Sequence, residues 1–183
     1  MKYTSQHGIV GVIKPTMRPG SLEEFIRLMP EGVGVIPMFI GFNQGTKEEF
    51  AEGLSGYHPK VAELAELGAT IIHPEGGPPL MLSGVIAEQK LTQLWEHQFG
   101  VPVITSGQTQ IEALKILNAR KIVATSYLSS EVNAVVANYF TEAGFEMATM
   151  KGISTPFMEA GNLSTEQIYL HTKQTFLEHP GAD

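Results

Sequence analysis

The sequence contains no cysteine among its 183 residues. This absence excludes disulfides and thiolate metal sites, and a cytoplasmic location is expected. Basic residues are also few, because 12 Lys and Arg stand against 19 Asp and Glu and give a formal net charge of −7. Without a basic cluster to neutralise phosphates, no nucleic-acid partner is expected.

Long apolar runs are missing as well. No segment approaches the roughly 18 apolar residues of a membrane span, and residues 1–7 lack the apolar core of a signal peptide. The six histidines show neither an HExxH motif nor paired-ligand spacing, so no metal site and no other cofactor are expected. Neither the dinucleotide-binding GxGxxG motif nor a P-loop occurs, which leaves a nucleotide binder as a weak alternative.

What the sequence does contain is an alternation of short apolar runs and amphipathic stretches, with 43% hydrophobic residues overall. The runs predict strands over residues 8–13, 33–38, 69–72, 101–105, 121–125 and 145–150. The pattern is typical of an α/β fold with a mainly parallel sheet flanked by helices.

Helix signals fill the segments between these runs. Capping-box spacing at Ser21 to Glu24 and at Ser164 to Gln167 predicts two helix starts. Residues 47–67 have helical periodicity, and Pro59 should kink that stretch or split it in two. Further amphipathic helices are expected within residues 85–99, 111–117 and 132–140.

We predict two similar Rossmann- or flavodoxin-like lobes, with residues 1–100 in the first and 101–183 in the second. Two alike strand ends, at residues 72–77 and 124–130, would then face each other across one cleft. The last helix runs into His-Pro-Gly at residues 179–181, where a turn and a new strand would be expected. We therefore expect the second lobe to be incomplete at its C-terminus, with the natural polypeptide continuing past Asp183.

The loop after the third predicted strand carries Glu75, Gly76 and Gly77. In open α/β sheets ligands bind beyond the carboxyl ends of the strands, where these residues would lie. Adjacent glycines let backbone N–H groups turn toward an anion. The alternative is a tight loop with a solvated glutamate.

Four segments of the sequence resemble the aspartate/glutamate racemase superfamily, namely residues 101–106, 112–127, 131–133 and 140–145. The similarity is closest to its arylmalonate decarboxylase and maleate cis-trans isomerase branch, and residues 8–15 and 163–180 fit the same branch. The resemblance implies two α/β lobes with the active site between them. It also implies cofactor-free racemisation, cis-trans isomerisation or decarboxylation of small carboxylic acids.

The resemblance assigns roles to particular positions. Tyr127 matches a tyrosine that donates to the substrate carboxylate, and Glu75 falls where racemases have their first catalytic cysteine. Gly76 and Gly77 fall among substrate-contacting donors, and Pro15 and Thr16 match a loop that borders the pocket. The sequence departs from the family pattern because the first lobe has no thiol, and the second-lobe cysteine would lie beyond Asp183.

Carbanion chemistry next to a carboxylate needs hydrogen-bond donors for the enediolate and a group that moves a proton. Glu75 and Tyr127 are the candidate catalytic residues. The candidate substrate-binding residues are Pro15, Thr16, Phe39, Phe42, Asn43, Gly76, Gly77, Thr105, Ser106, Ser126 and Leu128. Among them, the residues that follow the second predicted strand, at positions 39, 42 and 43, are expected to form a lid or an apolar wall.

Three functions remain open from the sequence. The first is a decarboxylase or an isomerase that works through a carbanion-like intermediate. The second is a cofactor-free hydrolase that uses Glu75 to activate water. The third is a non-catalytic protein that binds small carboxylates, and the absence of cysteine favours this interpretation. A homo-oligomer is possible in each case.

Overall fold

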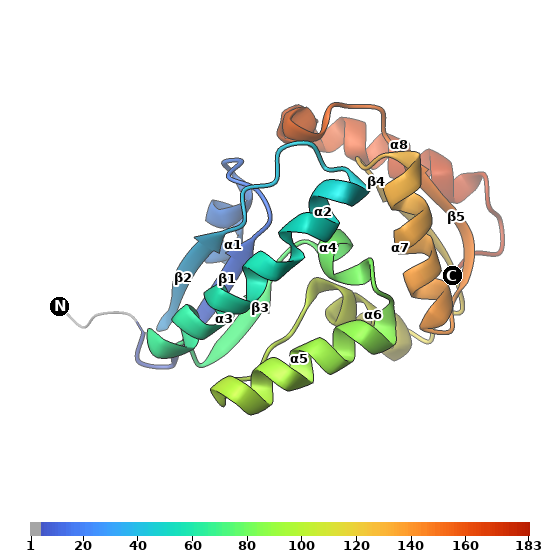
Figure 1. The fold of residues 1–183 in the computed structure, drawn as a ribbon. Coiled ribbons are helices and arrows are strands. Elements are labelled where there is room, and N and C mark those ends of the chain that lie inside the picture. Colours follow the sequence, from blue (N-terminus) through green and yellow to red (C-terminus); the bar gives the residue numbers. More distant parts are fainter. Residues whose placement is uncertain (1–4) are drawn as a thin grey trace.

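The computed structural model describes residues 5–183 and contains two parallel sheets covered by helices (Figure 1). The first sheet has the order β2-β1-β3, with β1 at Gly8–Lys14, β2 at Val33–Phe39 and β3 at Ile71–Pro74. The second pairs β4 (Lys121–Ser126) with β5 (Glu146–Gly152). The predicted fold class is confirmed.

Helices connect the strands, as parallel pairing requires. In the first half they are α1 (Ser21–Leu28), α2 (Lys47–Gly53), a short 3₁₀ turn η1 (Leu54–Gly56), α3 (Tyr57–Glu66), α4 (Gly77–Met81) and α5 (Val85–Phe99). In the second half they are α6 (Ser106–Ile116), α7 (Ser130–Glu142), the 3₁₀ segment η2 (Phe157–Asn162) and α8 (Thr165–Leu177). No helix in this described part of the chain is both long and apolar enough to cross a membrane.

Local sequence explains several boundaries. The predicted helix over 47–67 is split in two at the 3₁₀ turn Leu54–Gly56, and Pro59 lies in the first turn of α3, where its missing N–H has no helical partner. Ser164 caps α8 with the predicted capping box, since its hydroxyl accepts from Gln167 N. At α1 the prediction was one residue late, because Gly20 is the N-cap and its N–H donates to Glu23.

Two predicted strands need correction. The third strand spans Ile71–Pro74 rather than 69–72, because the chain is still turning at Gly68, which has a φ of +83°. Residues 101–105 form a single bridge, between Val103 and Ile72, rather than a strand. Pro102 has no N–H for a ladder, and Thr105 already caps α6.

The loop predicted after β3 contains a short helix, α4. Pro78 and Pro79 lie in its first turn, where their fixed φ is already helical and no backbone donor is lost. This helix starts directly after Gly76 and therefore sets the direction in which the chain leaves β3.

One hydrophobic core serves both sheets. Its buried side chains include Ile13 and Ile72 from the first sheet and Ile122 from the second, together with helix residues such as Trp95 and Tyr139. In Figure 1, α4 lies between the first sheet and α7, and α4 contacts α7. The division of the chain at residue 100 stays a prediction.

Candidate active site

A cavity of about 460 Å³ opens at the carboxyl ends of β1, β3 and β4. The first lobe contributes the segment that follows β1 and the start of the loop after β3. The second contributes the end of β4 and one side of α8. Residues from both predicted lobes therefore line one space, at the sheet edge where α/β proteins bind ligands.

A buried ion pair forms one end of this cavity. The Lys14 ammonium donates to both carboxylate oxygens of Glu75, at 2.8 and 3.0 Å, and to Ser21 Oγ at 2.6 Å. The Lys14 side chain is 1% exposed, whereas that of Glu75 is 26% exposed. The lysine is thus held in place by its acceptors, and the glutamate keeps access to the cavity.

The backbone fixes Glu75 as firmly as its side chain does. Glu75 N donates to Ile13 O at 2.9 Å, which extends the β1–β3 ladder by one residue. Gly76 follows with a φ of +83°, and a Cβ there would lie 2.6 Å from Pro15 Cγ. Only glycine fits this turn. Gly76 N in turn donates to Ser106 Oγ at 3.2 Å.

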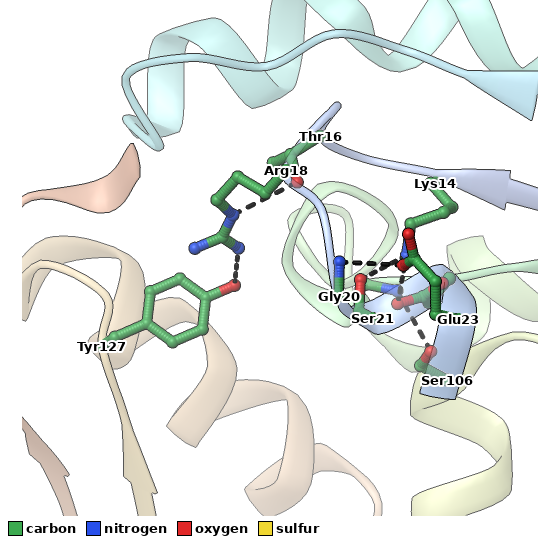
Figure 2. A network of polar contacts seen from close by, with 10 residues as sticks. Lys14, Thr16, Arg18, Gly20, Ser21, Glu23, Ser106 and Tyr127 are labelled. Atoms are coloured by element: carbon green, nitrogen blue, oxygen red, sulfur yellow. Dashed lines mark hydrogen bonds and ion pairs between the residues drawn. The ribbon is translucent and has the colours of Figure 1, made fainter. Parts of the chain in front are cut away.

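Arg18 and Tyr127 form the other end, and Phe157, which lines the neighbouring cavity, packs against both. Arg18 Nη2 donates to the Tyr127 hydroxyl at 2.8 Å, and Arg18 Nη1 donates to Phe157 O at 2.9 Å. The guanidinium carbon lies 4.8 Å from the centre of the Tyr127 ring and 5.1 Å from that of Phe157. Figure 2 shows Arg18 reaching from the chain after β1 to Tyr127, away from the group that contains Lys14 and Ser21.

A second cavity of about 830 Å³ adjoins the first and shares Tyr127 and Ile153 with it. Leu128, Phe157 and the first turn of α7 line it on the side of the second sheet. Gln44 to Thr46 line it from the first half of the chain. Tyr127 therefore stands at the junction of the two cavities.

The structure brings together six of the predicted site residues, which line the smaller cavity: Pro15, Thr16, Glu75, Gly76, Ser126 and Tyr127. Leu128 lines only the larger one. Ser106 lies behind Gly76, whose N–H it accepts, and Gly77 is buried at the start of α4. The functional roles of these residues stay predictions.

The remaining predicted residues line neither cavity. Thr105 is fully buried as the cap of α6. Phe42 is 3% exposed and packs edge-on against Phe50, which is a core position rather than a lid. Phe39 ends β2, and Asn43 N donates to the Glu49 carboxylate at 2.7 Å.

Sequence reasoning missed Lys14 and Arg18. A lysine as the last residue of an apolar strand is a usable signal, because parallel strands buried on both faces seldom carry charge. For Arg18, the signal is its position in the loop after the first strand, next to the predicted Pro15 and Thr16.

Two buried ionisable groups lie outside the cavity wall. Burial raises the pKa of the Tyr57 hydroxyl, and the negative charge of Glu75 adds to the effect. Burial also raises the pKa of Glu88, while hydrogen bonds from Tyr139 and Thr105 oppose the shift. Tyr57 Oη and Glu88 Oε1 have no hydrogen-bond partner among residues 5–183.

Within the described residues, no group of three or more His, Asp or Glu side chains is arranged to hold a metal ion. The polar groups that line the smaller cavity are instead the Lys14–Glu75 ion pair, the Arg18 guanidinium, several hydroxyls, the Glu24 carboxylate and the His171 ring. Such a set is suited to binding a small anion and to moving a proton next to it.

The fold and this cavity define a two-lobed α/β protein with an anion-compatible site between the lobes. The arylmalonate decarboxylase family model matches residues 10–183. The chain therefore belongs to the arylmalonate decarboxylase family. No curated protein matches it by sequence.

Solved structures share the fold at low sequence identity. A mutant of arylmalonate decarboxylase in the liganded form is 20% identical with a TM-score of 0.85, and the match covers 96% of this chain and 75% of that one. Maleate isomerase from Pseudomonas putida S16 with maleate is 19% identical (TM-score 0.68), with 81% and 64% covered. This chain thus spans less than two thirds of that isomerase.

Maleate cis-trans isomerase from Nocardia farcinica, with a covalently bound succinylcysteine intermediate, is 15% identical. Its TM-score is 0.81, and the match covers 91% of this chain and 72% of the isomerase. The covalent intermediate belongs to that protein's cysteine, a residue type that is absent from this chain.

Proposed function

We propose that the protein is a cofactor-independent enzyme that acts on a small carboxylic acid through an enediolate, as a decarboxylase or an isomerase. The observation that supports this most is that Glu75 and Tyr127, from opposite halves of the chain, line one cavity of about 460 Å³. Membership of the arylmalonate decarboxylase family supports the reaction class.

Glu75 is the proposed acid and base. Lys14 and Ser21 fix the geometry of the pair, and the exposed quarter of the Glu75 side chain faces the space where a substrate would bind. The Lys14 ammonium also compensates the charge of Glu75. A carboxylate substrate would therefore meet a neutral pair rather than a repelling anion.

Tyr127 is the proposed donor to the substrate carboxylate. Its oxygen accepts a hydrogen bond from Arg18 at 2.8 Å, so its own proton is directed to a different acceptor. A hydroxyl that already accepts a bond from a cation is also a stronger donor, because the two bonds polarise each other. One well-placed donor to a developing oxyanion contributes about 3–4 kcal/mol.

In isomerisation at a saturated carbon, which inverts the configuration of that carbon, Glu75 removes the proton from the carbon next to the carboxylate. The electron pair of that C–H bond enters the carboxylate and forms the enediolate, and the same proton or one from solvent then returns to carbon. In decarboxylation, the bond to the departing carboxylate breaks, CO₂ leaves, and its electron pair forms the enediolate. The Lys14–Glu75 pair supplies the proton that completes the product and regains one from water.

The test is turnover of phenylmalonate and of one enantiomer of 2-phenylpropionate in D₂O, followed by NMR, with maleate as a further candidate substrate. We expect the product to carry deuterium at the carbon next to the carboxylate, and Glu75→Gln to lower kcat by about 10²- to 10⁴-fold. Glu63→Gln, on the exposed face of α3, is the matched control and should leave kcat unchanged.

Other outcomes identify the competing functions. Cleavage of a carboxylic ester with oxygen from H₂¹⁸O in the acid product, in place of turnover of these acids, would indicate a hydrolase. Binding of these acids without any turnover would indicate a carboxylate-binding protein. Turnover that Glu75→Gln leaves intact would contradict the proposed role of Glu75.

A further inference from the structure

Arg18 differs from Lys14 in the charge of its partners. Its three hydrogen-bond acceptors are all neutral: Thr16 Oγ1, Phe157 O and the Tyr127 hydroxyl. Across residues 5–183 the ion pairs are Lys14–Glu75, Lys121–Glu146 and Lys151–Glu178, and Arg18 takes part in none of them. The wall of the smaller cavity therefore contains a guanidinium that forms no ion pair, although Glu24 and Glu75 line the same cavity.

The guanidinium also has donors to spare. Arginine carries five N–H groups, and the three bonds of Arg18 use one on Nε, one on Nη1 and one on Nη2. One N–H on each terminal nitrogen therefore has no acceptor among the described residues. Two N–H donors and a delocalised positive charge match the two oxygens of a carboxylate.

The position of this guanidinium is fixed in advance. Its carbon lies within 5.1 Å of the centres of two rings, those of Tyr127 and Phe157. Aromatic contacts stabilise the cation and displace water from around it. A ligand that binds Arg18 therefore does not have to order a mobile side chain first, which lowers the entropic cost of binding.

We infer that Arg18 is the carboxylate anchor of the cavity and that it binds the ligand together with the Tyr127 hydroxyl. The ligand is a small carboxylate with one anionic group at this end. Its remainder includes an apolar part that contacts Ile153, Leu163 and Ile168, in a cavity that is also lined by Glu24, His171 and Thr172. The inference takes the location of the site from the proposed function but does not require that any reaction occurs there.

The experiment measures binding to the full chain by calorimetry, with phenylacetate and phenylacetamide as probes. These probes have the same size and differ in the charge of one end. We expect Arg18→Gln to raise the Kd of phenylacetate by about 10- to 100-fold, since a charge-assisted bond is lost. The Kd of phenylacetamide should change less than twofold. Arg18→Lys, which keeps the charge but loses the planar fork, should fall between.

Arg27→Gln, in the exposed last turn of α1, is the matched control and should bind both probes like the wild type. An unchanged Kd for phenylacetate in Arg18→Gln would overturn the inference, and so would wild-type protein that binds the amide as tightly as the acid or binds neither. Circular dichroism and thermal unfolding of each variant distinguish lost binding from lost folding.

These outcomes are separate from those of the proposed function. If Arg18→Gln loses phenylacetate but no acid is ever turned over, the anchor stands and the enzyme proposal falls. If phenylmalonate or maleate is turned over and Arg18→Gln leaves its KM unchanged, the enzyme proposal stands and the anchor falls.

Discussion

The two ends of the smaller cavity differ in whether their positive charge has an ion-pair partner. At one end Lys14 and Glu75 compensate each other, with Ser21 as a further acceptor. At the other end Arg18 is surrounded by neutral acceptors and aromatic rings. The two cations are only four positions apart in the sequence, with Lys14 as the last residue of β1 and Arg18 in the chain that follows it.

The difference indicates that the two ends of the cavity have different roles. A charge-compensated ion pair costs little free energy when it stays buried without a ligand, so it can hold a proton carrier in place. An uncompensated cation gains most when an anion arrives, so it provides affinity. The comparison makes opposite predictions for the two ends: changes at Lys14 should affect stability first, and changes near Arg18 should affect binding first.

The largest effect is expected from Lys14→Met. The variant keeps the length of the side chain but leaves Glu75 without its cation, and breaking a buried pair from one side is costly. Because Glu75 is 26% exposed, water offsets part of the loss, and we expect the free energy of unfolding in urea to fall by about 2–3 kcal/mol. The double variant Lys14→Met/Glu75→Gln should recover about half of this loss.

Lys121→Met is the matched control for this prediction. The Lys121–Glu146 pair has the same 2.8 Å separation, but its side chains are 40% and 67% exposed. Exposed pairs contribute about 0–1 kcal/mol. If the two lysine variants lose equal stability, burial does not strengthen the Lys14–Glu75 pair and the prediction is wrong.

A smaller effect is expected from Glu88→Gln, which tests a carboxyl buried without any cation. Glu88 is 1% exposed and accepts from the Tyr139 hydroxyl, and burial raises its pKa. The folded state therefore holds the proton more tightly than the unfolded state. The contribution of Glu88 to stability is full below its unfolded pKa and is lost as the pH rises through the folded value.

Glutamine cannot ionise, so the variant should lack this loss. We expect the stability of Glu88→Gln relative to wild type to increase between pH 5 and pH 8, measured by urea unfolding at each pH. All other titratable groups are common to both proteins and cancel in the difference. A relative stability that is flat or falls with pH would contradict the argument.

The smallest effect is expected from Tyr127→Phe. It removes one neutral hydroxyl while Arg18 keeps its contact with the ring, so the Kd of phenylacetate should rise by about 3- to 10-fold. The free energy of unfolding should change by less than about 1 kcal/mol, because the hydroxyl is only half-buried. A loss of unfolding free energy that exceeds the loss of binding free energy would contradict the roles assigned to the two ends.

Much of the fold was predictable because its signals are local. Strands at β1, β2, β4 and β5 follow from apolar runs, and the start of α8 follows from Ser164 and Gln167. The bridge at Val103 and the helix α4 were missed. Both depend on prolines, at Pro102 and Pro78, whose effect changes with the tertiary partner of the backbone around them.

The site divides in the same way. Glu75, Gly76 and Tyr127 were predicted from strand-end loops and a family resemblance, and all three line one cavity. Phe42 has the composition of a lid residue, yet it packs into the core against Phe50. A phenylalanine after a strand can turn toward a ligand or toward a helix, and the sequence pattern is identical in both cases.

The sequence by itself determined the α/β alternation and the loops in which the candidate reactive groups stand, because periodicity and capping act over a few residues. Only the tertiary structure decided that Lys14 compensates Glu75, 61 positions away, and that Arg18 meets Tyr127 across 109 positions. Charge is either cancelled or left available by such long-range contacts. The chemical character of each end of the cavity therefore arises from packing between distant segments.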